Sequence, residues 1–134
     1  MTQSSESPLI LNESETLFRQ VHPTQFPNGQ PSSEAFVPSE QDKFLLSTMR
    51  EMVGPEEAHR RWTEDMEKQS VGTFGISVRE INDQGLTAVD DAEATAQPDH
   101  ASVDFSSVTS KGARKRIGRR LRDAAVSRGC LFQP

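Results

Sequence analysis

The sequence predicts a single α+β domain, in which two helices pack on a small antiparallel or mixed sheet. A length of 134 residues suits one domain. Residues Val71–Ile81 alternate between apolar and polar side chains, as a half-buried strand does. Two other stretches, which begin at Pro55 and at Lys111, carry apolar residues at helical spacing. Since strands and helices do not alternate regularly along the chain, an α+β fold is favoured over a βαβ fold.

Short apolar runs bounded by turn residues predict the strands. Asn82–Gly85 is a turn, so the run after it is expected to pair with Val71–Ile81 as a hairpin. The proline-rich stretch Thr24–Ser39 should form a loop anchored by Phe26 and Phe36, and the acidic stretch Asp90–Asp99 an exposed loop. The expected strands are Leu17–Val21, Phe44–Thr48, Val71–Ile81, Leu86–Val89 and Ala101–Phe105.

The first helix should begin at Gly54–Pro55, because proline suits the first helical position and acidic residues follow it. The second should begin near Thr109–Ser110 and end at Gly129, with Gly118 weakening it by about 1 kcal/mol relative to alanine. The predicted order is therefore β–loop–β–α–β–β–β–α. Residues 1–14 are expected to form a disordered tail, and residues 15–134 the domain. The apolar stripes are Ala58, Trp62 and Met66 in the first helix, and Ala113, Ile117, Leu121, Ala124 and Ala125 in the second.

Composition argues against several classes of protein, namely membrane-spanning, secreted, disulfide-bonded and metal-binding ones. No apolar run approaches the roughly 18–20 residues of a membrane span, and the polar start is no secretory signal. A single cysteine, Cys130, excludes an internal disulfide and a cysteine-rich zinc site, and its apolar neighbours predict a buried, unreactive thiol. The three histidines lack helical metal-ligand spacing, so neither a metal nor a cofactor is expected. These features favour a cytoplasmic protein.

Positive charge gathers at the C-terminal end of an otherwise acidic chain. Residues 111–134 hold eight basic residues and one acidic residue, whereas residues 1–110 hold seven basic and 19 acidic ones. The outward side of this helix is a candidate surface for a protein partner, and nucleic acid is the less favoured alternative because the acidic body would repel it. Simple surface pairing of these charges is a third interpretation. The candidate partner-binding residues are Arg114, Lys115, Arg116, Arg119 and Arg120.

One resemblance suggests an enzyme. Arg19 on an early strand, Ser47–Thr48 on the next, a helix, and Glu80 on a later strand follow in an order that loosely resembles the first half of ADP-ribosyltransferase-like domains. The resemblance implies that Arg19 binds the phosphates of NAD, that Ser47 and Thr48 brace the nicotinamide, and that Glu80 is the acid. The chain departs from the family's pattern, since it lacks the second serine of the strand and a Glu-x-Glu pair.

His22 and His100 are further candidates for acid–base chemistry, because histidine titrates near neutral pH. A Ser–His–Asp triad of Ser47, His100 and Asp42 is conceivable, but no nucleophile elbow or glycine cluster supports it. Structural roles are the favoured alternative for these residues. Arg19 would pair with a carboxylate, His22 would cap a turn, and His100 would donate a hydrogen bond at the start of a strand.

Nearly the whole domain also resembles a family of small bacterial proteins without an assigned activity. The shared pattern is Arg19–Pro23, Pro31–Pro38, Asp42, the Leu46–Ser47 pair, and His100–Phe105 before a basic helix that ends at Arg128–Gly129. It implies a place in variable bacterial gene clusters, defence or toxin-type systems among them. From the sequence we therefore expect a non-catalytic accessory protein that binds another protein, with an ADP-ribosyltransferase-like enzyme and a nucleic-acid binder as the alternatives.

Overall fold

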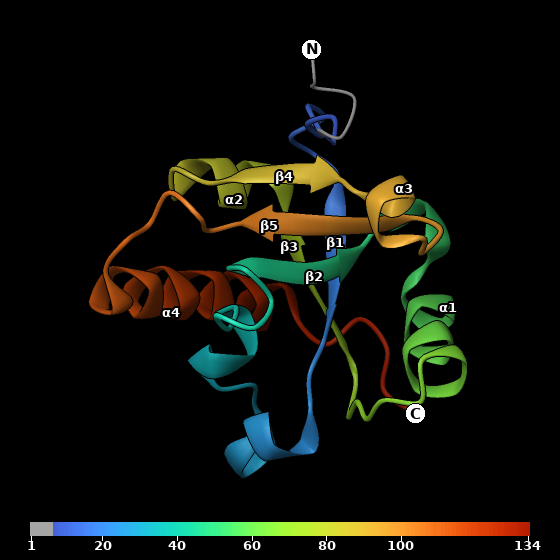
Figure 1. The fold of residues 1–134 in the computed structure, drawn as a ribbon. Helices are drawn as coiled ribbons and strands as arrows, with labels where there is room; N and C mark the ends of the chain where they lie inside the picture. Colours follow the sequence, from blue (N-terminus) through green and yellow to red (C-terminus); the bar gives the residue numbers. More distant parts are fainter. Residues whose placement is uncertain (1–6) are drawn as a thin grey trace.

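The computed structural model describes residues 7–134, which form one antiparallel sheet with helices on both faces, so the predicted α+β class is confirmed (Figure 1). The strand order is β3-β1-β2-β5-β4, and every pairing between neighbours is antiparallel. The strands are β1 (Thr16–Gln20), β2 (Leu45–Met49), β3 (Thr73–Ser77), β4 (Thr87–Asp90) and β5 (His100–Asp104).

Four α-helices connect or cover the strands. Figure 1 shows α4 and α1 on opposite sides of the sheet, with α2 on the side of α4 and α3 on the side of α1. A π-helical turn, η6 (Arg61–Asp65), directly extends α1. The helices are α1 (Pro55–Arg60), α2 (Val78–Asp83), α3 (Ala92–Thr95) and α4 (Lys111–Arg128).

Strand register assigns the two faces of the sheet different roles. Successive side chains of a strand point to opposite faces. One face carries the fully buried residues Leu17, Leu46, Ile76 and Val103, which form the main core with α2 and α4. The other face carries a smaller apolar cluster of Phe18, Met49 and Ala58, and beside it a row of polar side chains. The site described below lies on this second face.

Gly118 is the point at which α4 meets the loop between β1 and β2. A Cβ atom at this position would lie 2.3 Å from Val37 Cγ2 and 3.1 Å from the carbonyl oxygen of Ser33. The 3-10 helix η4 (Ser33–Phe36) therefore packs directly on the helix backbone, and it brings the fully buried Phe36 into the core. The glycine that weakens α4 as an isolated helix is required for its packing.

The strand expected over Val71–Ile81 ends at Ser77, and the prediction is wrong for the remainder. The hydroxyl of Ser77 accepts a hydrogen bond from the backbone N–H of Glu80, and the carboxylate of Glu80 accepts one from the N–H of Ser77. This capping box starts α2 in place of a strand, because it satisfies two N–H groups of the first helical turn.

The predicted hairpin of Val71–Ile81 with Leu86–Val89 is also wrong. β3 pairs with β1, and β4 pairs with β5, at the two opposite edges of the sheet. Helix α2 lies between the two strands in sequence, so no tight turn joins them. The predicted element order thus lacks two short helices, α2 and α3.

Two further expectations differ from the structure. The backbone of residues 8–10 lies along β4, where Ile10 N–H donates to Ala88 O and Asp90 N–H to Pro8 O; the predicted disordered tail is therefore ordered in this part, while residues 1–6 lie outside the described residues. Cys130 is exposed and not buried. The chain after Gly129 runs beside β3, where its backbone pairs with Thr73 and leaves the thiol at the surface.

Candidate functional site

A cleft of about 810 Å³ opens on the polar side of the sheet, and we call it the sheet cleft. Its floor consists of side chains from the ends of β1, β2 and β5. Its walls come from the segments that follow β1, η6 and α3 in the chain. The residues of interest that line it are Arg19, His22, Asp42, Ser47, Trp62, Lys68, Asp91, Gln97, His100 and Ser102.

The cleft forms where β1 and β2 separate. These two strands pair only at Phe18 and Met49, whereas β2 and β5 pair along five consecutive residues. Arg19, which points to the same face as Leu17, occupies the opening between the two strands. Its Nε–H donates to the carbonyl of Ala35 (2.7 Å) and its Nη1–H to that of Ser47 (2.9 Å). The guanidinium thus joins the two diverging strands to the proline-rich loop.

Four side chains in the cleft form a continuous chain of three hydrogen bonds. Ser47 Oγ lies 2.6 Å from His100 Nε2, and His100 Nδ1 lies 2.6 Å from Asp91 Oδ1. The other oxygen of Asp91 accepts a hydrogen bond of 2.6 Å from Ser102 Oγ. His100 and Asp91 are buried, whereas Ser47 is partly exposed in the cleft. This is the arrangement of a nucleophile, a base and an orienting carboxylate.

The hydrogen bonds fix the proton positions in this chain. Burial alone would raise the pKa of Asp91, but the hydrogen bonds from His100 and Ser102 lower it overall, so Asp91 is a carboxylate at neutral pH. An ionised carboxylate only accepts hydrogen bonds, and therefore His100 carries its proton on Nδ1. The Nε2 atom of a neutral imidazole is then the acceptor, and the hydroxyl of Ser47 donates to it.

Helix α3 and its flanking turns place Asp91 on the site. Asp91 is the N-cap residue of α3, and its backbone carbonyl accepts the N–H of Thr95. The preceding Asp90 bonds the N–H of Ala92 and forms an ion pair with Arg50. These contacts fix the main chain of the turn, so the Asp91 side chain points back to β5.

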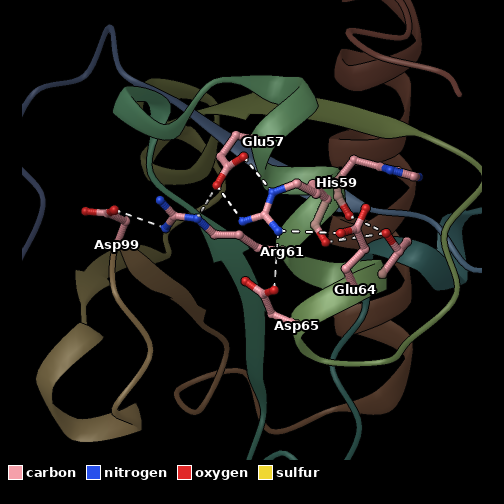
Figure 2. A network of polar contacts seen from close by, with 8 residues as sticks. Glu57, His59, Arg61, Glu64, Asp65 and Asp99 are labelled. Carbon is pink, nitrogen blue, oxygen red and sulfur yellow. Dashed lines mark hydrogen bonds and ion pairs between the residues drawn. The ribbon is translucent and has the colours of Figure 1, made fainter.

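An ion-pair network that includes α1 holds the residue before His100. Figure 2 shows Arg61 between Glu57 and Asp99, to which it donates hydrogen bonds of 3.1 Å and 3.2 Å. The carbonyl of Asp99 accepts the N–H of Arg50. Asp99 has a positive φ of 62°, a left-handed conformation that aspartate adopts more readily than most residues. Because Asp99 directly precedes His100, this network holds the main chain at the start of β5.

The structure brings together four of the five residues that the sequence singled out for chemistry. Arg19, His22, Ser47 and His100 all line the sheet cleft. Glu80 does not line it; it caps α2 and forms an ion pair of 2.9 Å with Arg128. The set of Arg19, Ser47 and Glu80 that the ADP-ribosyltransferase resemblance implies is therefore not assembled in one cleft.

The structural roles expected for these residues are met for His22 and for His100, which begins β5 and donates to Asp91, but not for Arg19. His22 Nδ1 accepts the backbone N–H of Thr24 and so caps the turn Pro23–Gln25, as expected. Arg19 has no ion pair with a carboxylate among residues 7–134, contrary to that expectation. Asp42, the carboxylate considered for a triad, bonds Ser39 and not His100.

Sequence reasoning missed Asp91 and Ser102, although it identified Ser47 and His100. Asp91 sits in an acidic, alanine-rich stretch that is typical of an exposed loop. No local signal marks it, because its carboxylate does not cap α3 but bonds His100 and Ser102 on the neighbouring strand.

The basic residues of α4 fall into two groups. Arg114 donates to the carbonyl of Val108 and lies over the ring of Phe44, and Arg120 bonds Gln84. Lys115, Arg116 and Arg119 are exposed, and they form no ion pair or hydrogen bond with side chains of residues 7–134. Buried residues Ile117, Leu121 and Ala125 hold the opposite side of the helix against the core.

Within residues 7–134, no three His, Cys, Asp or Glu side chains gather closely enough to hold a metal ion. None of the helices in that range has both the length and the apolar composition needed to span a membrane. Comparisons with protein families, curated proteins and solved structures give no match for this chain.

Proposed function

We propose that this protein is a serine hydrolase that cleaves acyl esters, with Ser47 as the nucleophile, His100 as the general base and Asp91 as the residue that orients His100. The observation that carries this proposal is the chain of three hydrogen bonds of 2.6 Å from Ser47 through His100 and Asp91 to Ser102. A purely structural network can be buried throughout. In this one, the terminal serine, Ser47, is accessible from a cleft of about 810 Å³.

In the first step, Ser47 Oγ attacks the ester carbonyl and its proton passes to His100 Nε2. The resulting imidazolium donates that proton to the leaving alkoxide as the C–O bond breaks, which leaves an acyl group on Ser47. Water then attacks the acyl carbon, gives one proton to His100, and releases the carboxylic acid while Ser47 regains its proton. Asp91 stabilises the imidazolium in both steps and keeps its own charge.

The negative oxygen that forms on the acyl carbon needs a hydrogen-bond donor. Gln97 lines the sheet cleft together with Ser47 and His100. Its Oε1 is buried and accepts no hydrogen bond within the described part of the chain, so no acceptor contact fixes the orientation of the amide. In this proposal the NH₂ group of Gln97 turns to the oxygen and stabilises it.

Hydrolysis of p-nitrophenyl acetate by the purified protein tests the proposal. The variant Ser47→Ala should lower kcat/KM by at least about 10³-fold, since it removes the nucleophile. Ser106→Ala is the matched control, because Ser106 is an exposed serine just after β5 and outside the cleft. Equal activities of the Ser47→Ala variant and the wild type would show that Ser47 is not the nucleophile.

A second candidate function, the binding of a protein partner, is supported by the side chains of Lys115, Arg116 and Arg119 on α4, which are exposed and have no ion-pair partner among residues 7–134. Their charge suits an acidic surface, and rim charges of this kind mainly raise association rates at low salt. If this surface binds an acidic protein, changing all three residues to Glu should abolish the complex while the circular dichroism spectrum stays unchanged. A complex that survives this change would exclude the outward side of α4.

A further inference from the structure

Arg19 is one of two arginines that are partly buried and yet have no carboxylate partner among residues 7–134; the other is Arg114. Five other arginines have carboxylate partners within 4.0 Å: Arg50, Arg60, Arg61, Arg122 and Arg128. Arg19 has none among residues 7–134, and its two hydrogen bonds go to neutral backbone carbonyls. An arginine has five N–H donors, so several remain for another acceptor.

The Arg19 side chain is also partly buried. Burial lowers its pKa to about 10, and the charge of Asp42 only partly opposes this effect. At neutral pH the side chain therefore stays positive in a setting that disfavours the charge. A buried charge without a partner is costly, and an anion bound beside it would remove that cost. Asp42 does not supply the anion, because its carboxylate is exposed and accepts the hydroxyl of Ser39.

The position of Arg19 connects this charge with the proposed nucleophile. Its Nη1–H donates to the carbonyl oxygen of Ser47, the same residue whose hydroxyl meets His100. Arg19 points to the face of Leu17 and Ser47 to the opposite face, but both residues are partly exposed and line the sheet cleft where β1 and β2 separate. Lys68 lines the same cleft, where its ammonium lies 4.5 Å from the centre of the Trp62 ring.

From this geometry we infer that Arg19 forms an oxyanion subsite in the sheet cleft, which binds the carboxylate or phosphate group of the substrate that Ser47 cleaves. The identity of the cleaved bond rests on the proposed hydrolase function, whereas the subsite itself does not. A guanidinium binds the two oxygens of such a group through a planar pair of N–H donors. The substrate class is accordingly an ester whose acyl part carries a negative group.

Binding of inorganic phosphate and of succinate tests the subsite without any hydrolysis. Trp62 is the only tryptophan and lines the cleft, so its fluorescence reports the occupancy of the cleft. Both anions should bind saturably to the wild type, and Arg19→Gln should weaken the binding by at least about tenfold. A lower Kd for phosphate than for succinate would identify a phosphate group as the better ligand. A lower Kd for succinate would identify a carboxylate.

Arg114→Gln is the matched control, because Arg114 also lacks a carboxylate partner and donates to a backbone carbonyl, but lies outside the cleft. It should bind phosphate as the wild type does. Should Arg19→Gln fail to fold, phosphate titration of the wild type by NMR decides the question, because the largest shifts should occur at the Nε–H of Arg19 and the amide of Ser47. Shifts confined to α4, or no saturable binding of either anion, would overturn the subsite.

The proposed anion subsite and the proposed hydrolase activity can be refuted independently of each other. Ser47→Ala should retain phosphate binding, because the serine hydroxyl is not part of the subsite. Anion binding without ester hydrolysis would support the subsite and refute the hydrolase. If hydrolysis occurs, the wild type should prefer mono-(p-nitrophenyl) succinate to the neutral p-nitrophenyl acetate, and Arg19→Gln should reduce this ratio of kcat/KM values by about tenfold. An unchanged ratio would contradict the role of Arg19 in substrate choice.

Discussion

His100 Nδ1 lies 2.6 Å from Asp91 Oδ1, and both side chains are buried behind the partly exposed Ser47. The two residues are nine positions apart in the chain, and the turn through α3 brings them together. Because the second oxygen of Asp91 is held by Ser102, the carboxylate presents one fixed lone pair to the imidazole. This contact determines which nitrogen of His100 is free to accept a proton from Ser47.

The variant Asp91→Asn should lower kcat/KM for ester hydrolysis by about 10³–10⁴-fold. The asparagine amide can donate to Nδ1, which would move the imidazole proton to Nε2 and remove the acceptor for Ser47. Kinetics and the ¹⁵N chemical shifts of the His100 ring together check the prediction, since a purely structural role would not change the tautomer.

Ser102→Ala serves as the control for this variant. It removes only the hydrogen bond to the Asp91 oxygen that does not contact His100. It should lower kcat/KM by about tenfold and leave the His100 tautomer unchanged. If Asp91→Asn retains both the tautomer and the activity, the orienting role of Asp91 is excluded.

The elements with strong local signals could be predicted from the sequence. Helix α4 lies between its cap at Ser110 and Gly129 as expected, and Phe36 anchors the proline-rich loop in the core. Helix α2 was missed because the alternation through Val78 hid a capping box of Ser77 and Glu80. The pairing of β3 with β1 was missed because neighbours in a sheet depend on the packing of the whole domain, which local patterns do not encode.

The same distinction applies to the site. Ser47, His100 and Arg19 were candidates because of their residue types and their places on predicted strands. Asp91 could not be assigned, because its role depends on the register between β2 and β5 and on the turn at α3, neither of which the sequence alone specifies. The order of strands and helices in the ADP-ribosyltransferase-like resemblance implies Glu80 as the acid, but its carboxylate forms an ion pair with Arg128.

Acid should destabilise the fold through carboxylates whose pKa values the folded state lowers. The side-chain hydrogen bond from Arg50 lowers the pKa of Glu15 below its ordinary value of 4.5, and the pKa of Asp91 is also lowered. The unfolded chain therefore binds protons more readily than the folded one. The stabilisation is complete above about pH 4.5 and is lost as the pH falls through the lower pKa values of the folded state.

Urea unfolding between about pH 6 and about pH 3 checks this dependence. Glu15→Gln removes the charge that Arg50 contacts at 2.6 Å and should lower the free energy of unfolding by about 2 kcal/mol at neutral pH, with a shallower decline in acid. A variant as stable as the wild type at neutral pH would show that this partly buried ion pair contributes nothing to the fold.

Gly118→Ala should destabilise the protein by about 1–3 kcal/mol, although alanine is the better helix former. The added methyl would meet Val37 Cγ2 at 2.3 Å, so the loop must move away from α4. Gly112→Ala is the matched control, because the nearest atom to its Cβ lies 3.8 Å away. The control should be stabilised by a few tenths to about 1 kcal/mol in thermal unfolding. Stabilisation of both variants to the same degree would contradict the packing described for Gly118.

The most direct test of the account is covalent labelling of the protein with a fluorophosphonate, followed by peptide mass spectrometry. This reagent reacts with a serine whose hydroxyl is activated by a neighbouring base. The account predicts one label per chain, on Ser47, and its loss in His100→Ala, while Ser106→Ala labels as the wild type does. The absence of any label on Ser47, or labelling that survives His100→Ala, would contradict the proposal that Ser47, His100 and Asp91 form a catalytic unit.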